Sequence, residues 1–97
     1  MSNPILRIVD KHIEIEMPGK TYKVLEVYGS ATNWLWLATE QKGKAPKRTF
    51  YGLVYGLERE WGSFSEAELL SIPVISKMTS EDIAILPWSF PMADWEE

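Results

Sequence analysis

The first third of the chain alternates polar and apolar residues with a period of two. Residues 12–17 place three apolar side chains on one side and polar side chains on the other, which is typical of a half-buried β-strand. Residues 21–28 are rich in β-branched and aromatic side chains, and Pro18 and Gly19 supply a turn between the two runs. The pattern therefore predicts a β-hairpin of 12–17 with 21–28, after a short β-rich run at 5–9.

The middle of the chain predicts the centre of a sheet. In residues 33–40 tryptophans alternate with leucines, so both faces are apolar and a strand here would be covered on both sides. Residues 49–57 predict a neighbouring strand that contains Gly52 and Gly56. Glycine inside a strand marks a bulge or a close backbone approach. Residues 61–64 predict a short final strand.

Two helix starts follow the strands. Ser65 and Glu68 have the spacing of a capping box, which predicts a helix over about 66–71. Thr79 and Asp82 repeat that spacing and predict a second helix of about one turn. The pattern as a whole predicts an α+β fold: an antiparallel β-meander of four to five strands, with one capped helix and a short second helix packed on one face.

Composition places the chain among ordinary globular domains, because 45% of its 97 residues are hydrophobic and 25% are charged. We expect one domain over residues 1–97, with 1–4 and about 91–97 disordered. No apolar run is long enough to cross a membrane and no leader pattern is visible, so we expect a cytoplasmic protein. The chain has no cysteine and one histidine, so we expect neither a metal nor another cofactor.

Charge is distributed unevenly around a net charge of −4. The first half of the chain is basic and the second half is acidic, so each half has its own candidate contact surface. The basic surface pairs four cations of one loop with two neighbouring aromatic residues: Lys42, Lys44, Lys47, Arg48, Trp36 and Tyr51. The acidic surface is the set Glu58, Glu60, Asp94, Glu96 and Glu97.

A series of motifs in the middle of the chain resembles a known family. Residues 33–40 match the pattern Asn-Trp-x-Trp-x-x-Thr-Glu, and residues 50–56 match Phe-x-Gly-Leu-Val-x-Gly. A Glu-x-Gly-x-Phe-Ser turn and a helix start come after them at 60–68. In this order, over about residues 33–72, the chain resembles the Domain of Unknown Function 2958 family. The resemblance implies a small accessory protein of a plasmid or phage, and it carries over no catalytic residue.

Chemistry-bearing residues are few, which favours a binding function over an enzymatic one. Glu40, Glu58 and Glu60 are candidate acid–base groups, but charged turns contain such residues equally well. His12 has Asp10 two residues before it, yet no serine is singled out as a nucleophile. We therefore expect a non-enzymatic interaction protein of a mobile element that binds a host or element-encoded protein. The alternative is a single-stranded nucleic-acid-binding module that uses the sheet aromatics and the basic loop.

Overall fold

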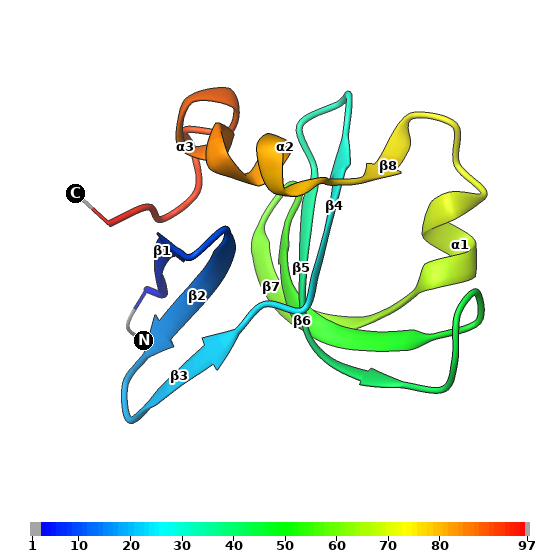
Figure 1. Cartoon of the computed structure of the whole chain (residues 1–97), viewed down its shortest axis with the longest axis horizontal. Helices are drawn as coiled ribbons and strands as arrows, with labels where there is room; N and C mark the ends of the chain where they lie inside the picture. Colours follow the sequence, from blue (N-terminus) through cyan, green and yellow to red (C-terminus); the bar gives the residue numbers. More distant parts are fainter. Residues whose placement is uncertain (1–2, 97) are drawn as a thin grey trace.

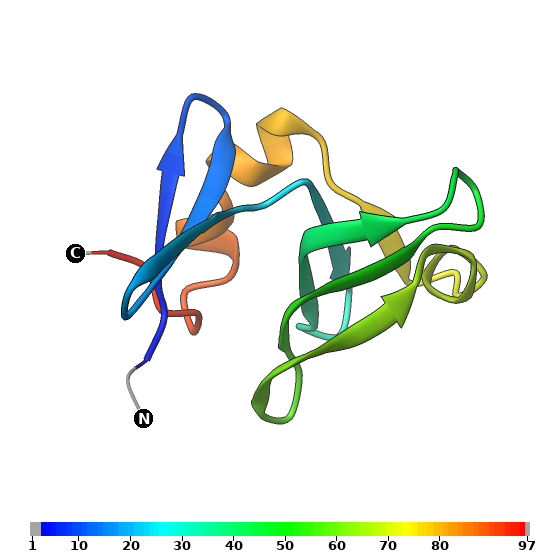
Figure 2. The same cartoon turned by 90° about the horizontal axis from the view of Figure 1, so that it is seen from below.

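The computed structural model of the chain describes residues 3–96, and it contains two antiparallel sheets (Figures 1 and 2). The first sheet has three strands in the order β1 (Ile5–Val9), β2 (His12–Met17) and β3 (Lys20–Lys23). The second sheet has five strands in the order β7 (Arg59–Ser65), β6 (Thr49–Tyr55), β5 (Leu35–Lys42), β4 (Glu26–Ser30) and β8 (Ile75–Lys77). Three short helices complete the chain: α1 (Glu66–Leu70), α2 (Ser80–Ala84) and α3 (Leu86–Ser89). The α+β class and the β-meander, here β4 to β7, are confirmed.

The predicted strand 21–28 is in fact two strands that belong to different sheets. The amide of Val24 donates to the Ile13 carbonyl of the first sheet at 2.9 Å, whereas the next amide, Leu25, donates to Ala38 of the second sheet at 2.7 Å. The chain therefore leaves one sheet and enters the other within two residues. Because both halves remain extended, the side-chain pattern gives no sign of this transfer.

Strand β5 is covered on both faces, as its alternating pattern predicts. Leu35 and Leu37 are fully buried in one apolar cluster with residues of the first sheet and of α3. Ala38 is buried in a second cluster, against which Trp36 packs. The two predicted helices divide between the clusters, because α1 contributes Leu69 to the second cluster, whereas Ile83 of α2 packs against the first. The prediction that both helices pack on one face is therefore wrong.

A bulge in β5 determines which side chains share a face near its end. The register with β6 shifts between Ala38 and Glu40, so that Leu37 lies opposite Leu53 and Glu40 lies opposite Tyr51. Leu53 and Tyr51 are two residues apart on β6 and so point to the same side. The bulge thus places Glu40 on the same face as buried Leu37, and that face continues from the core out to solvent.

Gly52 confirms the predicted close backbone approach. A Cβ atom built there would lie 1.9 Å from the carbonyl oxygen of Leu37 on the neighbouring strand. Gly56 has a related role, because an added Cβ would lie 2.3 Å from the ring of Trp34. Both glycines are therefore required by close packing of β5 against β6.

The described ends of the chain, for which the sequence predicts disorder at 91–96 and at residues 3–4, pair through main-chain hydrogen bonds in the structure, and their disorder stays a prediction. The Leu6 amide donates to the Asp94 carbonyl and the Glu96 amide donates to the Leu6 carbonyl, each at 2.8 Å. Pro4 is buried, and the indole of Trp95 donates to the Phe90 carbonyl at 2.8 Å. The main chain of β1 therefore holds the C-terminal segment beside it (Figure 1). Residues 1–2 and 97, also predicted to be disordered, lie outside the described residues.

Helix α1 starts at the predicted cap, since the Ser65 hydroxyl accepts from the Glu68 amide at 3.3 Å. Of the three helices among the described residues, α2 alone has the full reciprocal capping box, formed by Thr79 and Asp82. Within residues 3–96 no helix has the length and apolarity that a membrane crossing requires.

Candidate interaction surfaces

Arg48, predicted to contact a partner from the basic loop, is bound inside the protein instead. Its guanidinium donates to both carboxylate oxygens of Glu66, at 3.0 and 2.6 Å, and to Glu26 at 3.2 Å. Only 13% of its side chain is exposed, and Glu66 is exposed by 5%. The amide of Glu66 also donates to the Arg48 carbonyl at 3.0 Å. Arg48 therefore joins the end of the β5–β6 loop to the start of α1 and is withdrawn from the candidate surface.

The electrostatics of this ion pair agree with a structural role. Hydrogen bonds from Arg48 lower the pKa of Glu66 to about 2, although burial acts in the opposite direction. The hydroxyl of buried Tyr28 donates to Glu66 at 3.3 Å, and burial raises the pKa of Tyr28 to about 12. Glu66 thus stays ionised at neutral pH, and hydrogen bonds from Arg48 and Tyr28 hold its carboxylate in place.

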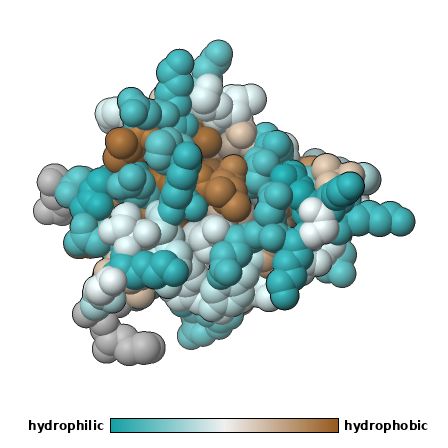
Figure 3. All heavy atoms as spheres, turned by 60° about the horizontal axis from the view of Figure 1, so that its bottom comes forward, coloured by the Kyte–Doolittle hydropathy of each residue, from teal (hydrophilic) through white to brown (hydrophobic). Residues whose placement is uncertain are grey.

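The remaining basic residues of the loop are free to reach a partner. Lys42, Lys44 and Lys47 are all exposed, and none of them makes an ion pair within the described part of the chain. Figure 3 shows hydrophilic side chains projecting on the right, where the β5–β6 loop and α1 lie. The predicted basic surface is therefore reduced to three lysines.

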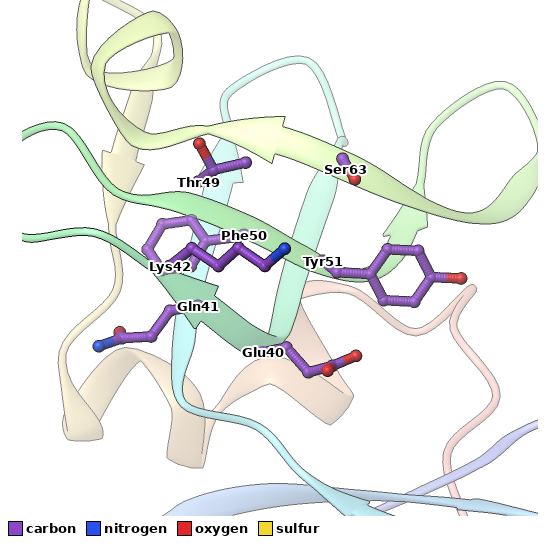
Figure 4. A pocket seen from close by; sticks show the side chains of 7 residues that line it. All are labelled: Glu40, Gln41, Lys42, Thr49, Phe50, Tyr51 and Ser63. Carbon is purple, nitrogen blue, oxygen red and sulfur yellow. The ribbon is translucent and has the colours of Figure 1, made fainter.

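Trp36 and Tyr51, the predicted aromatic contacts, lie on opposite faces of the sheet. Trp36 is half-buried, stacks on Trp34 with 5.8 Å between ring centroids, and packs against the second cluster. Tyr51 is 41% exposed and stacks on Trp61 with the centroids 6.1 Å apart. Only Tyr51 therefore shares a surface with Lys42, whose side chain extends towards it in Figure 4.

Tyr51 is the outer member of a row of three rings, which we call the aromatic strip. Trp61 of β7 contacts both other rings, and the Tyr22 ring of β3 lies 5.2 Å from it between centroids. The strip thus joins side chains of both sheets. A hollow lies on each side of Tyr51. The first is lined by Glu40, Gln41, Lys42, Thr49, Phe50, Tyr51 and Ser63 (Figure 4), and the second by Met17, Pro18, Tyr22, Tyr51 and Trp61.

The predicted acidic surface is divided by ion pairs. Asp94 accepts from Arg59 at 2.9 Å and from the Tyr55 hydroxyl at 2.6 Å. Glu96 is paired with Arg7 at 3.1 Å, and hydrogen bonds from Arg7 lower its pKa. These two carboxylates hold the C-terminal segment against the body of the protein. Glu97 lies outside the described residues.

Glu58 and Glu60 retain the predicted free charge and flank an exposed apolar residue. Both are exposed, and neither makes an ion pair within residues 3–96. Leu57, in the β6–β7 turn, is 93% exposed.

A hollow on one side of this turn is lined by Trp34, Val54, Leu57, Glu58 and Glu60. A second hollow, on its other side, is lined by Tyr55, Gly56, Leu57, Glu58, Arg59, Phe90 and Met92. We call residues 56–58 the Leu57 turn.

Sequence reasoning did not single out Leu57, Tyr22 and Trp61 as candidate contact residues. A signal for Leu57 was present, because a leucine between glycine and glutamate in a hairpin turn has nothing local to pack against. No comparable signal existed for the aromatic strip, since Tyr22 and Trp61 are far apart in the chain and meet only when the two sheets are in place.

The remaining chemical candidates do not form a cluster. The His12 ring nitrogen lies 3.3 Å from the carbonyl oxygen of Asp10, and the contact is with the main chain. Within the described part of the chain, no group of three or more histidine, cysteine or carboxylate side chains is arranged to hold a metal ion. Comparison of the chain with protein-family models, with curated proteins and with solved structures found no match. The resemblance to the Domain of Unknown Function 2958 family stays a prediction.

Proposed function

We propose that the protein is a non-enzymatic interaction protein of a mobile genetic element, and that it binds a host or element-encoded protein through the Leu57 turn. The observation that carries this proposal is the 93% exposure of Leu57 at the tip of a hairpin. Burying one leucine side chain in a partner contributes about 1.5–3 kcal/mol. An exposed leucine between two hollows is thus a suitable anchor for a protein contact.

The charges around Leu57 specify the kind of partner. Glu58 and Glu60 flank the turn without an internal partner in the described residues, whereas nearby Arg59 is occupied by Asp94. The local charge is therefore negative, and it favours a protein with arginine or lysine side chains around an apolar pocket. Opposite charges at the rim of an interface chiefly increase the association rate and the specificity.

The alternative, a single-stranded nucleic acid, has weaker support. Withdrawal of Arg48 leaves three loop cations, so the slope of log affinity against log salt would be only about −2. Base stacking also needs a free ring face. Trp61 packs against two neighbouring rings, and Trp34 and Trp36 stack on one another.

A matched set of variants in an affinity capture tests the proposed function. Wild-type protein, Leu57→Ser and the double variant Glu58→Lys/Glu60→Lys are immobilised and exposed to a bacterial lysate with and without nuclease. Leu70→Ser serves as the control, because Leu70 is also an exposed leucine (48%) but lies on α1. We expect wild type and Leu70→Ser to retain the same proteins and both turn variants to lose them, regardless of nuclease. Equal retention by Leu57→Ser, or capture that nuclease abolishes, would contradict the proposal.

A further inference from the structure

We propose that the aromatic strip is a binding site for a proline-rich peptide segment in the polyproline II conformation, with acidic residues at its ends. This site is separate from the Leu57 turn, so each proposal fails or stands by its own variants. The strip lies in the middle of a shallow surface, with a hollow on each side of Tyr51. Grooves lined by aromatic rings are a common docking surface for polyproline II segments. Here the proline rings of the peptide would enter the two hollows beside Tyr51.

The polar atoms of the strip match this ligand. A polyproline II helix makes no internal hydrogen bonds, so its carbonyl groups are all available as acceptors. The hydroxyls of Tyr22 and Tyr51 and the indole N–H of Trp61 supply three donors. Three other aromatic polar groups have internal acceptors: Tyr28 donates to Glu66, Tyr55 to Asp94 and Trp95 to the Phe90 carbonyl. Within residues 3–96 the three donors of the strip have none, so they remain available to a ligand.

The stacking of the strip favours a peptide over a nucleic-acid base. The Trp61 ring is tilted by 48° against Tyr22 and lies within 22° of parallel to Tyr51. Two rings therefore pack against the indole and reduce the ring surface that it offers to a base, while its N–H donates to no acceptor within residues 3–96. An edge with a donor suits a peptide carbonyl, whereas a base needs the ring face itself. Packing among the three rings also holds them in place before binding, which reduces the entropic cost of association.

The charges at the two ends of the strip specify acidic flanks for the peptide. The Lys20 ammonium lies 4.7 Å from the centre of the Tyr22 ring at one end. At the other end Lys42 lines the first hollow and extends towards Tyr51 (Figure 4). Glu40 offsets one of these charges, so the surface keeps an excess of positive charge. A proline-rich segment with glutamate or aspartate at both ends complements it.

Titration with defined probes tests this site. The probes are a synthetic peptide of Pro-x-x-Pro repeats with glutamate at both ends, the same peptide with alanine for proline, and a short oligothymidine. Trp61 lies in the strip, so tryptophan fluorescence reports occupancy, and two-dimensional NMR locates the shifted residues. We expect a saturable change with the proline peptide, at least tenfold weaker binding of the alanine peptide, and no saturable change with the oligonucleotide.

Two variants connect the titration to the strip. Tyr51→Ala removes an exposed ring and is expected to weaken the proline peptide about tenfold, as loss of a central interface residue does. Lys42→Glu is expected to weaken the acidic-flanked peptide and to leave a neutral-flanked version unchanged. Leu57→Ser is the control and should bind as wild type does, and a thermal melt verifies that each variant is folded. Equal binding of the proline and alanine peptides, or a titration by oligothymidine that Tyr51→Ala abolishes, would overturn the proposal.

Discussion

The two connections on either side of β6 have opposite relations to the rest of the protein. The β5–β6 loop, residues 43–48, is polar and basic, and its last residue, Arg48, is only 13% exposed at its side chain. The β6–β7 turn carries an apolar residue, Leu57, that is 93% exposed. Arg48, predicted to contact a partner, thus makes an internal ion pair that stabilises the fold. Leu57, an apolar residue that falls inside the predicted strand 49–57, is instead exposed to solvent.

The difference teaches that residue type is a poor guide to availability where ion pairs are present. Arg48 has a bidentate carboxylate partner because Glu66 follows the helix cap and its amide bonds to the Arg48 carbonyl. Glu66 lies 18 residues from Arg48 along the chain, and the pairing of β6 with β7 brings the two side chains together. Leu57 has no comparable partner because a three-residue turn leaves its side chain beyond both strands.

The largest effect is expected from breaking the loop's internal contact. Arg48→Ala leaves the buried carboxylate of Glu66 without its cation, and removal of one partner from a buried pair costs about 3–5 kcal/mol. The free energy of unfolding in urea, measured by circular dichroism, should fall by at least the lower value. Lys47→Ala is the neighbouring control and should stay within about 0.5 kcal/mol of wild type. If both variants unfolded alike, Arg48 would be as free as the lysines and the contrast between the two connections would disappear.

Acid titration tests the same contact between Arg48 and Glu66. Because Arg48 lowers the folded-state pKa of Glu66 from 4.5 to about 2, the pair stabilises the fold fully above pH 4.5. That stabilisation decreases as the pH falls from 4.5 towards 2. Urea midpoints of wild type and Glu66→Gln should therefore differ by a constant amount near neutral pH. The difference should shrink across this acidic window. A difference that does not change with pH would show that Glu66 is not held as a carboxylate by Arg48.

Sequence patterns predicted those parts of the fold that depend on local periodicity. The alternation in β5, the glycine inside the β6 pattern and the cap at Ser65 are each signalled by residues within a few positions of one another. The transfer of the chain between sheets at Val24 and Leu25 depends on main-chain hydrogen bonds to distant strands. Main-chain groups are the same in every residue, so no side-chain pattern marks such a change.

The candidate surfaces were predictable to a smaller extent, for the same reason. Lys42, Glu58 and Glu60 are exposed as their sequence context suggests. Asp94, by contrast, is removed from the acidic surface by Arg59, which lies far from it in the chain and reaches it only through the fold. Which charged residues form ion pairs with distant partners is determined only by the folded structure, so it cannot be predicted from local sequence patterns.

The smallest effect is expected from the two loop lysines that have no internal partner. Lys44 and Lys47 are exposed, and within the described residues neither makes an ion pair. The double variant Lys44→Glu/Lys47→Glu should therefore change the free energy of unfolding by no more than about 0.5 kcal/mol in urea denaturation. Since these residues lie beyond Lys42 on the loop, the proline peptide should also keep its affinity for the aromatic strip. A loss of stability near that of Arg48→Ala would mean that the whole loop is framework. The distinction between its buried end and its exposed tip would then be wrong.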